Sequence, residues 1–536
     1  MSTDTLPAPS AGARPTPLSR ATRVRALLRA DELHFARWHV IAAVSLLMAG
    51  SVWLRTRGIH AYYWIDEGLS VGIASHPLGH IPSLLGQDGS PPLYYLVLHV
   101  WMSIWGRGEV ATHALSLVFA LLTIPAAYWA GSSLFDRRAG LVCAALAAGA
   151  PYLTTYAQET RMYALLTLLS LIACASFTEV FVRRRRGYLP VFVVSLAAAL
   201  YTHNWAIFLA LTAGAAFLLC VWETIPTERR ALWRDALFAL VGVAILYAPW
   251  LSTLLYQVRH TGAPWDLPPV VWSLSQGLYS IAGGRGAAVA LLLAGGSGLW
   301  ALRQPGTARE RFLLAAKALL ILSFGTLVVA WAYSKITPAW AIRYLAVVVG
   351  PLILLFGLGV ARAGRLGLVA LALVACWWVL DPVPLARTSK SNVATVAAKV
   401  RHHLGSDPVV LSTQPEQVPT LAYYLPAVKH FVTPMGRVPD PRVVDWRSAL
   451  ERLRRSSVRS VLMPIVDRMK PGQRLLLVTP IALPSVPVYL HLIDRYSHQW
   501  FRALARDRAL KWIAVTDDGS HGSGVGVEAY LFVKRS

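Results

Sequence analysis

The chain is short of cysteine and short of acidic residues. Its 536 residues include only four cysteines, all inside hydrophobic runs and too scattered for a zinc pattern. We therefore expect no disulfides and no structural metal site. Asp and Glu number 27 against 51 Lys and Arg, a formal charge of +24. In a soluble chain this excess would suggest nucleic acid. Here much of the arginine lies in short connections between apolar runs, so it indicates membrane topology and no nucleic-acid partner.

Long apolar runs recur from His39 to Leu380, and 55% of all residues are hydrophobic. This pattern predicts an α-helical polytopic membrane protein with about eleven transmembrane helices. The first run lies too deep for a cleaved signal peptide, so we expect a retained anchor after a disordered, basic cytoplasmic tail over residues 1–37. The spans are expected near 39–54, 110–133, 140–155, 164–182, 188–202, 204–222, 236–255, 287–302, 313–333, 344–361 and 366–381.

Five short basic connections are expected on the cytoplasmic side, following the positive-inside rule. They lie at 136–138, 183–186, 228–234, 303–311 and 362–365. The remaining connections are then outside, and an odd number of spans also puts the C-terminus outside. The assignment requires Leu93–Trp105, an apolar run of 13 residues, to lie along the outer interface. Counting it as a span would reverse every later loop.

The chain changes character at about Pro382, where long apolar runs stop. Residues 382–536 are expected to form an extracytoplasmic α/β domain, distinct from the transmembrane domain at 38–381. Predicted strands are Pro408–Ser412, Ser460–Ile465 and Trp512–Thr516, with helices over Val443–Arg455 and Leu490–Leu504. This region has no Gly-rich phosphate loop and no nucleophile elbow, so we expect it to play a supporting role.

Two adjacent acids, Asp66 and Glu67, follow the first apolar run directly, and Ser90-Pro-Pro-Leu-Tyr-Tyr95 comes some two dozen residues later. An ionisable side chain within the membrane costs about 2.5–3.5 kcal/mol on insertion scales. A pair at its edge therefore suggests a site that uses charge. The alternative is an ordinary loop with solvated acids.

The second outer connection reads Tyr156-Ala-Gln-Glu-Thr-Arg-Met-Tyr163. If a helix begins at Gln158, Glu159 and Tyr163 share one face, while Gln158 and Arg161 share another. Such a cluster presents polar side chains to two different ligand groups at once. The alternative is an internal Glu159–Arg161 ion pair at a helix end.

Three further cations lie on the predicted outer side. His203, beside Asn204, occupies a connection with almost no loop, where it either caps a helix or binds phosphate. Lys335 and Arg343 precede the span that starts at Tyr344. Arg presents a planar fork for two phosphate oxygens, whereas Lys is a point charge. The alternative for both is snorkelling to the interface, more so for Lys335.

Carboxylates and cations on one membrane face suit a sugar carried on a lipid phosphate. Cations would hold the phosphate while a carboxylate takes the proton from an attacking hydroxyl, a contribution of about two to four orders of magnitude. The acidic pair, the Pro-Pro-Leu-Tyr-Tyr motif and Tyr-Ala-Gln-Glu-Thr-Arg-Met-Tyr together resemble the GT-C membrane glycosyltransferases. Within them the chain is similar to the branch of protein O-mannosyltransferases and the lipid A aminoarabinose transferase, with bacterial and actinobacterial members. The likeness covers about residues 38–381, and Arg343-Tyr344 also fits it.

The resemblance implies the GT-C fold, a polyprenyl-phosphate-linked sugar donor, a lipid, glycan or protein acceptor, and an inverting reaction on the outer face of the cytoplasmic membrane. It implies Asp66 as general base, Glu67 as an orienting acid and Glu159 as a second acid near the donor. The implied donor-binding residues are Gln158, Arg161, Tyr163, His203, Lys335, Arg343 and Tyr344. The second loop lacks the Asp-any-Asp of oligosaccharyltransferases, so no cofactor is required and a divalent metal is not indicated. The sugar stays open between mannose and an arabinose-like residue.

Two rival classes remain. A transporter or flippase would carry charges near the bilayer midplane on interrupted helices repeated in two halves, and the sequence shows neither. A sensor or assembly protein would use the membrane part as an anchor, for which eleven spans are excessive.

Overall fold

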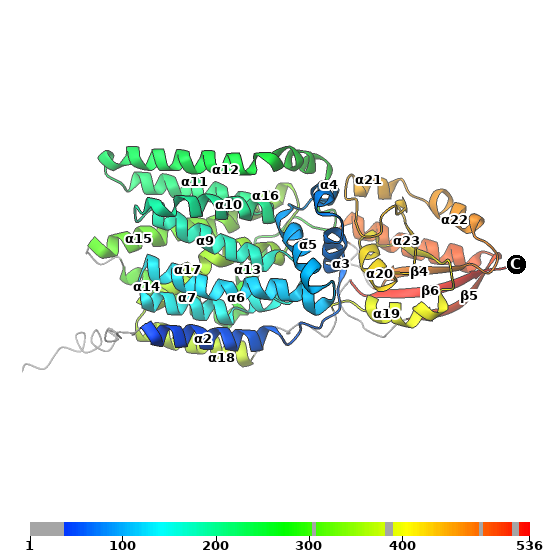
Figure 1. The fold of residues 1–536 in the computed structure, drawn as a ribbon, viewed down its shortest axis with the longest axis horizontal. Coiled ribbons are helices and arrows are strands. Elements are labelled where there is room, and N and C mark those ends of the chain that lie inside the picture. The colour runs from blue at the N-terminus through cyan, green and yellow to red at the C-terminus, as the bar shows by residue number, and fades with distance from the viewer. Residues whose placement is uncertain (1–36, 303–306, 381–389, 482–485, 517–524) are drawn as a thin grey trace, which may run out of the picture.

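The computed structural model describes residues 37–302, 307–380, 390–481, 486–516 and 525–536. A bundle of helices, α2 to α18, stands end-on against a smaller C-terminal unit built around one β-sheet (Figure 1). The predicted tail at 1–37 and the junction at 381–382 lie almost wholly outside the described residues. The two-part organisation itself follows the change in hydropathy along the chain.

Six helical stretches in the described part are long and apolar enough to cross a membrane, and a seventh is a pair bent by 89°. The six are Arg37–Arg55 (α2), Glu109–Leu134 (α6), Tyr163–Phe181 (α9), Pro226–His260 (α12), Glu310–Ile336 (within α15, η3 and α16) and Ile342–Arg362 (η4 and α17). The bent pair is Trp272–Ala282 (α13) with Arg285–Ala301 (α14). Shorter apolar helices cover most of the other expected spans: Leu189–Thr202 (α10), Ala206–Trp222 (α11) and Arg365–Leu380 (α18). The expected span 140–155 is divided between Arg137–Gly149 (α7) and Pro151–Tyr156 (α8).

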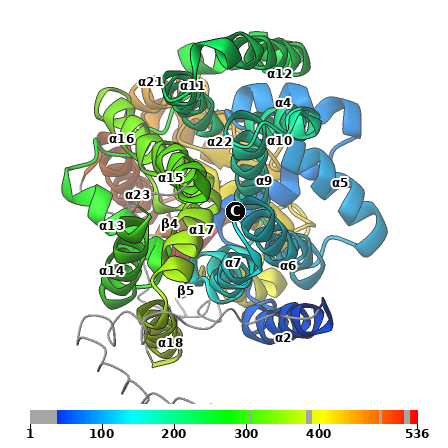
Figure 2. The same cartoon turned by 90° about the vertical axis from the view of Figure 1, so that its left-hand side faces the viewer.

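Two helices form the centre of the bundle. The apolar windows of α9 and α17 are 89% and 94% buried, whereas those of α2 and α12 are 11% buried and lie at the periphery (Figure 2). Close packing in the interior depends on small residues, as is usual between membrane helices. At Gly298 of α14 a side chain would collide with the backbone of Gly359 in α17.

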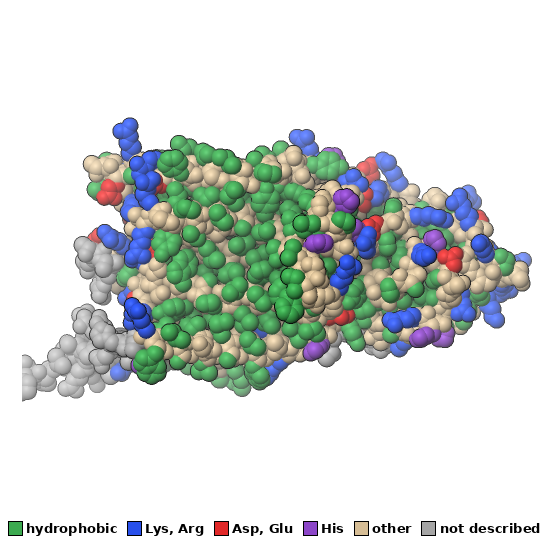
Figure 3. Space-filling model, in the orientation of Figure 1, with side chains coloured by type: hydrophobic (Ala, Val, Ile, Leu, Met, Phe, Trp, Pro, Cys, Tyr) green, Lys and Arg blue, Asp and Glu red, His purple; other side chains and the backbone are tan. Residues whose placement is uncertain are grey.

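The expected cytoplasmic connections meet at one end of the bundle. Arg184 pairs with Glu228 at 3.7 Å and Arg362 with Asp136 at 2.5 Å, each joining two of the basic connections. Figure 3 shows apolar side chains covering the flank of the bundle, with Lys and Arg gathered at the end remote from the sheet. These four of the five basic connections therefore lie at one end of the bundle, as the topology prediction requires, while most of 303–311 lies outside the described residues.

Three short helices cap the opposite end of the bundle, next to the sheet domain (Figure 1). They are Ile65–Ala74 (α3), Ile81–Asp88 (α4) and Leu93–Trp105 (α5). Helix α5 buries Tyr94, Tyr95 and Leu98 while exposing Ile104 and Trp105. It thus packs one face on the bundle and exposes large apolar side chains on the other, at the end of the bundle where the topology prediction placed this run.

The C-terminal unit is a six-stranded mixed sheet in the order β3-β2-β1-β4-β6-β5. The strands are Val409–Ser412 (β1), His430–Thr433 (β2), Gly436–Arg437 (β3), Arg474–Pro480 (β4), Leu510–Thr516 (β5) and Val527–Lys534 (β6). Strands β1, β2 and β4 are parallel to one another. The helices of this unit are Val393–Val400 (α19), Val418–Tyr424 (α20), Ala449–Arg454 (α21), Met463–Arg468 (α22) and Val488–Arg506 (α23).

The strand predicted at Ser460–Ile465 is wrong. Residues 458–468 are helical, with a π-turn over Val458–Leu462 followed by α22. Ser457 starts the helix by accepting a hydrogen bond from the Ser460 amide, and Pro464 sits in the first turn of α22, where its missing N–H is tolerated. The helix predicted over Val443–Arg455 is also shorter, since only α21 is helical.

The sheet domain docks on α3. Its helix α20 packs along α3, and Tyr424 accepts a hydrogen bond from the Tyr63 amide at 2.8 Å. His76, just after α3, lies 2.6 Å from the carboxylate of Asp440. At Gly72 a side chain would collide with the backbone carbonyl of Arg442. One short helix therefore belongs to the packing of both domains.

Candidate active site

Asp66 and Glu67 occupy the first turn of α3. Carboxylates are stabilised there because the helix N-terminus carries partial positive charge. Adjacent residues of an α-helix point about 100° apart, so the two acids face different surroundings. Asp66 faces a partly open space and its side chain is 18% exposed, whereas Glu67 is fully buried. The pair thus divides into one accessible acid and one interior acid.

Two arginines face the accessible acid. The guanidinium of Arg161 lies 3.9 Å from Asp66 Oδ2, and Arg343 Nε lies 3.6 Å from the same oxygen. Arg161 is positioned by hydrogen bonds that it donates to the hydroxyls of Ser70 at 3.0 Å and Tyr95 at 3.4 Å. These ion-pair distances exceed hydrogen-bond length. Among the described residues, the Nε groups of both arginines and Asp66 Oδ2 are buried without a hydrogen-bond partner.

The interior acid belongs to a second cluster. Glu67 Oε1 lies 2.6 Å from His113 Nε2 and accepts a hydrogen bond from the Thr160 amide at 2.8 Å. Lys390, close to the start of the C-terminal domain, places its ammonium 2.8 Å from Glu159 and 4.0 Å from Glu67. Two membrane-domain acids therefore share one cation supplied by the other domain.

Burial and charge oppose each other in this cluster. Burial alone would raise the pKa of Glu67, but Lys390 and His113 hold it below its usual value. Burial also raises the pKa of Glu159, and this effect outweighs the opposing one of Lys390. Burial would lower the pKa of Lys390, yet Glu159 and Glu67 raise it. Glu67 and Lys390 are therefore the firmly charged members, and Glu159 is the member closest to protonation.

No helix begins at Gln158, the condition for the side-chain pairing considered above; helix α9 begins at Tyr163. Residues 157–162 form a turn between α8 and α9 because their polar groups bond elsewhere. Gln158 donates to the Thr154 carbonyl at 2.9 Å and also accepts from the Gly58 amide, while the Thr160 amide bonds to Glu67. The side-chain pairing predicted from helical spacing is accordingly wrong: Glu159 meets Lys390, and Arg161 meets Asp66 and Tyr163.

Aromatic rings form one wall of the site. Arg343 lies over the rings of Trp64 and Tyr344, and Arg161 lies over Tyr163. His203 is packed against Tyr344 at 4.8 Å between ring centroids.

Burial lowers the pKa of His203 to about 3, and the two arginines add to this. Its Nδ1 accepts a hydrogen bond from the Trp205 amide at 3.1 Å, so the neutral ring carries its proton on Nε2. His203 is therefore a neutral ring whose Nδ1 accepts from a backbone amide at a helix start, close to the capping alternative, and whose Nε2–H is a donor; its binding of phosphate stays a prediction.

Lys335 is not brought to this site. Its exposed side chain lies over the Trp331 ring, 5.4 Å from the centroid, as the snorkelling alternative describes.

Two acids that the sequence did not single out reach the site, and so does Tyr95 of the Pro-Pro-Leu-Tyr-Tyr motif, to which the sequence gave no role. Tyr95 bonds to Arg161, and Asp88 and Asp266 interact electrostatically with Asp66 and an arginine. Burial raises the pKa of Asp88, and raises that of Asp266 to about 6. Asp88 ends α4 two residues before the Ser-Pro-Pro-Leu-Tyr-Tyr motif, and this closeness was the one sign in the sequence that it belongs to the site.

Within the described ranges, no three His, Cys, Asp or Glu side chains gather as metal ligands. The nearby acids Glu67 and Glu159 are engaged by Lys390, and Asp66 by arginines. The expectation that no divalent metal is required stays a prediction.

Comparison with known proteins identifies the fold of the chain. Residues 89–256 match the family model described as dolichyl-phosphate-mannose-protein mannosyltransferase. The apo crystal structure of ArnT from Cupriavidus metallidurans superimposes with a TM-score of 0.58 at 14% identity, over 96% of this chain and 98% of that one. The chain has the GT-C fold. ArnT bound to undecaprenyl phosphate gives a TM-score of 0.55 at 14% identity, over 93% and 98% of the two chains.

Two more distant structures share the GT-C fold. Arabinofuranosyltransferase AftD from Mycobacteria matches with a TM-score of 0.51 at 12% identity, over 95% of this chain and 40% of that one. The apo oligosaccharyltransferase from Archaeoglobus fulgidus matches with a TM-score of 0.55 at 11% identity, over 84% and 70%. No curated protein matches the sequence significantly. The GT-C fold and the apolar helices make this a multi-pass membrane protein.

Proposed function

We propose that this protein is a glycosyltransferase that moves one sugar, mannose or an arabinose-like residue, from a polyprenyl-phosphate donor to an acceptor hydroxyl. The reaction takes place at the outer face of the cytoplasmic membrane, with the N-terminus inside and the sheet domain outside. The observation that carries the proposal is Asp66, held between Arg161 and Arg343 at the end of the apolar bundle.

The two arginines suit a phosphate monoester or diester. Guanidinium groups present planar donors to two oxygens, and charge-assisted bonds of this type are about twice as strong as neutral ones. Their Nε donors have no hydrogen-bond partner among the described residues, and buried donors of that kind are rare unless a ligand uses them. The neutral His203 offers a further N–H on the same wall. A lipid phosphate bound here would replace the loose pairing with Asp66.

Freed from the arginines, Asp66 is the base. The acceptor oxygen attacks the anomeric carbon while its proton passes to Asp66. The bond between the anomeric carbon and the phosphate oxygen breaks, and its electron pair stays on the phosphate, which leaves as polyprenyl phosphate. Arg161 and Arg343 neutralise the charge that develops on that oxygen. A single displacement from the opposite face inverts the anomeric configuration. Glu67 fixes the first turn of α3 through His113 and the Thr160 amide.

Two comparisons support the donor class. The ArnT structure bound to undecaprenyl phosphate has the same fold over nearly the whole chain, and the matched family model is described by a dolichyl-phosphate-mannose reaction. The site also lies at the membrane edge, where the head group of a lipid-linked sugar is found.

The test is to incubate the purified protein with a panel of polyprenyl-phosphate sugars and measure sugar transfer. Asp66→Asn should abolish transfer while the variant still binds the donor lipid. Asp136→Asn, at the other end of the bundle, is the matched control and should transfer normally. If Asp66→Asn kept its turnover, or if no donor in the panel were consumed by the wild type, the proposal would be wrong. A flippase would instead move the lipid between leaflets and leave every donor intact.

A further inference from the structure

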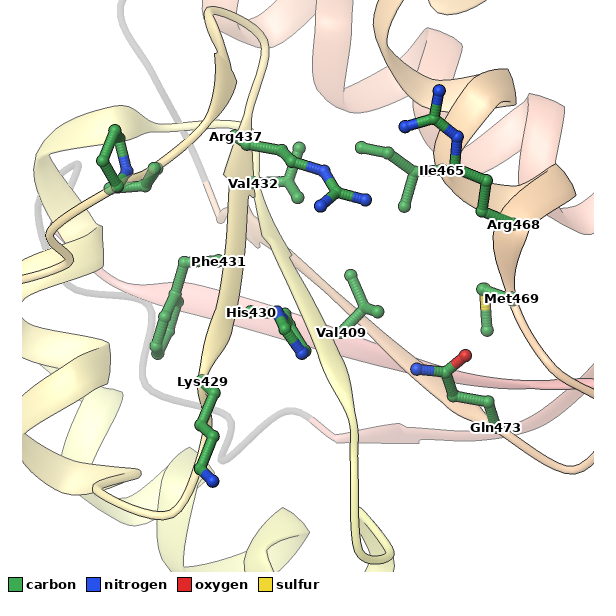
Figure 4. Close-up of a pocket in the computed structure, with 12 residues that line it drawn as sticks. Val409, Lys429, His430, Phe431, Val432, Arg437, Ile465, Arg468, Met469 and Gln473 are labelled. Carbon is green, nitrogen blue, oxygen red and sulfur yellow. The ribbon is translucent and has the colours of Figure 1, made fainter.

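Two hollows in the sheet domain meet at one arginine. The first, about 290 Å³, lies between the β2–β3 hairpin and α22 (Figure 4). The second, about 270 Å³, lies between that hairpin and α4 of the membrane domain, where it is lined by Leu84 and Gln87. Both are lined by Arg437, Val438 and Pro439. The two hollows therefore adjoin along this hairpin, one on its α22 side and one on its α4 side, and together they are called the groove.

The inner hollow adjoins the site. Gln87 precedes Asp88, the α4 residue that interacts with Arg161 and Asp66. The same hollow is lined by Pro415 and Thr433, at the carboxyl ends of β1 and β2. In open α/β sheets this edge is where ligands bind. A chain that occupied both hollows would extend from α22 to α4, the helix whose last residue, Asp88, interacts with Asp66.

The outer hollow is cationic. Lys429, His430, Arg437 and Arg468 line it together with an apolar floor, and none of its lining residues is acidic. In the part of the chain that the structure describes, Lys429, Arg437 and Arg468 make no ion pair, while His430 faces Asp407 at 3.2 Å. Figure 4 shows the Arg437 guanidinium and the Gln473 amide directed into the hollow, with Arg468 at its rim.

The acids of the inner hollow are already neutralised. Asp440 contacts His76 at 2.6 Å, and Asp445 pairs with Arg447 at 2.8 Å and with Arg452 at 3.6 Å. The groove as a whole therefore presents unpaired positive charge. Unpaired guanidinium groups above an apolar floor suit a sugar ring that carries a phosphate or carboxylate.

We propose that this groove binds the acceptor, and that the acceptor is a glycan chain with anionic groups, which Arg437 and Arg468 hold while a hydroxyl reaches Asp66. The assignment of the groove to an acceptor rests on the proposed transferase function. The binding of an anionic chain does not, so the two can be tested separately.

Binding is measured first, on the full chain in nanodiscs of zwitterionic lipid, with three labelled probes: inorganic polyphosphate, polygalacturonate and neutral dextran. The double variant Arg437→Gln/Arg468→Gln should lose tenfold or more in affinity for at least one polyanion. Arg495→Gln/Arg502→Gln makes the same charge change at exposed positions of α23 that line neither hollow, and it should bind like the wild type. The polyanion whose binding is lost identifies the anionic group as phosphate or carboxylate.

The proposal fails if the Arg437/Arg468 variant binds both polyanions as the wild type does. It also fails if the α23 control loses as much affinity, or if dextran binds as tightly as the polyanions. Thermal unfolding of both variants shows whether they are folded. In transfer assays the Arg437/Arg468 variant should raise KM for an anionic acceptor and leave kcat unchanged. If the wild type transfers no sugar but still binds polyanions through Arg437 and Arg468, the transferase proposal has failed, while the binding of an anionic chain in the groove is still supported.

Discussion

Lys390 connects the two domains by charge, and its removal makes the sharpest prediction. Lys390→Met keeps much of the side-chain length but leaves Glu159 without the ion pair at 2.8 Å. Glu67 retains His113 and the Thr160 amide, whereas no other side-chain partner of Glu159 occurs among the described residues. Removing one partner of a buried pair generally costs about 3–5 kcal/mol.

Glu159 can avoid being an unpaired buried charge by taking up a proton, so the free energy of that protonation is the upper limit of the destabilisation. A glutamate with an ordinary pKa near 4.3 must take up a proton at pH 7, which costs about 3.7 kcal/mol at 1.36 kcal/mol per unit, and about 1 kcal/mol at pH 5. In the variant the folded-state pKa of Glu159 lies above the unfolded value. Its destabilisation is therefore present above that value and disappears as the pH falls. Lys390→Met should lower Tm strongly at pH 7 and weakly at pH 5.

The assay is thermal unfolding of wild type, Lys390→Met, Glu159→Gln and the double variant at both pH values. The double variant has neither the ammonium nor the carboxylate of this pair, so it should recover most of the stability and lose the added pH dependence. Equal Tm values for wild type and Lys390→Met at pH 7 would refute the reasoning. So would a Lys390→Met deficit that is the same at pH 5 and pH 7.

Four further predictions concern the site and its support. Burial raises the pKa of Asp266 to about 6, above its value in the unfolded chain, so the free energy of unfolding falls as the pH rises from about 4 to 6. Asp266→Asn should remove this loss of up to about 3 kcal/mol, which is followed by measuring Tm against pH. Gly72→Ala should displace the sheet domain from α3 and lower both Tm and transfer, whereas Gly79→Ala, with nothing within 4 Å of its added methyl, should do neither. Arg343→Lys should raise KM for the donor about tenfold through loss of the planar fork, while Arg365→Lys at the opposite end should leave it unchanged. Chelation with EDTA should leave transfer unchanged, and a loss restored by a divalent ion would contradict the expectation that no metal is required.

The sequence predicted the membrane part well because its signals are local. Each expected span coincides with helix in the described residues, the one at 140–155 with two helices, since a run of apolar residues must satisfy its own backbone in lipid. The number of spans stays a prediction. The basic connections were enough to group the loops by side, and Asp66, Arg161 and Arg343 were correctly expected on one face. The branch of the superfamily and the roles of these residues stay predictions.

The sequence missed contacts between distant segments. Lys390 lies outside every motif and far along the chain from Glu159, and His113 reads as an ordinary residue of an apolar helix. The turn before α9 was read as helix because nothing local breaks it; what breaks it is the Thr160 amide bonding to Glu67 from another helix. Strands β2, β4 and β6 were missed because they need their neighbours in the sheet to be defined.

The glycines of α3 have a practical consequence. The helix carries Asp66 and Glu67 in its first turn and presents Gly68 and Gly72 to Thr420 and Arg442 of the sheet domain. A small molecule bound between α3 and the sheet domain would tilt the helix and displace Asp66, the proposed base. If the proposed function holds, an inhibitor that binds there would act without competing with the proposed lipid donor.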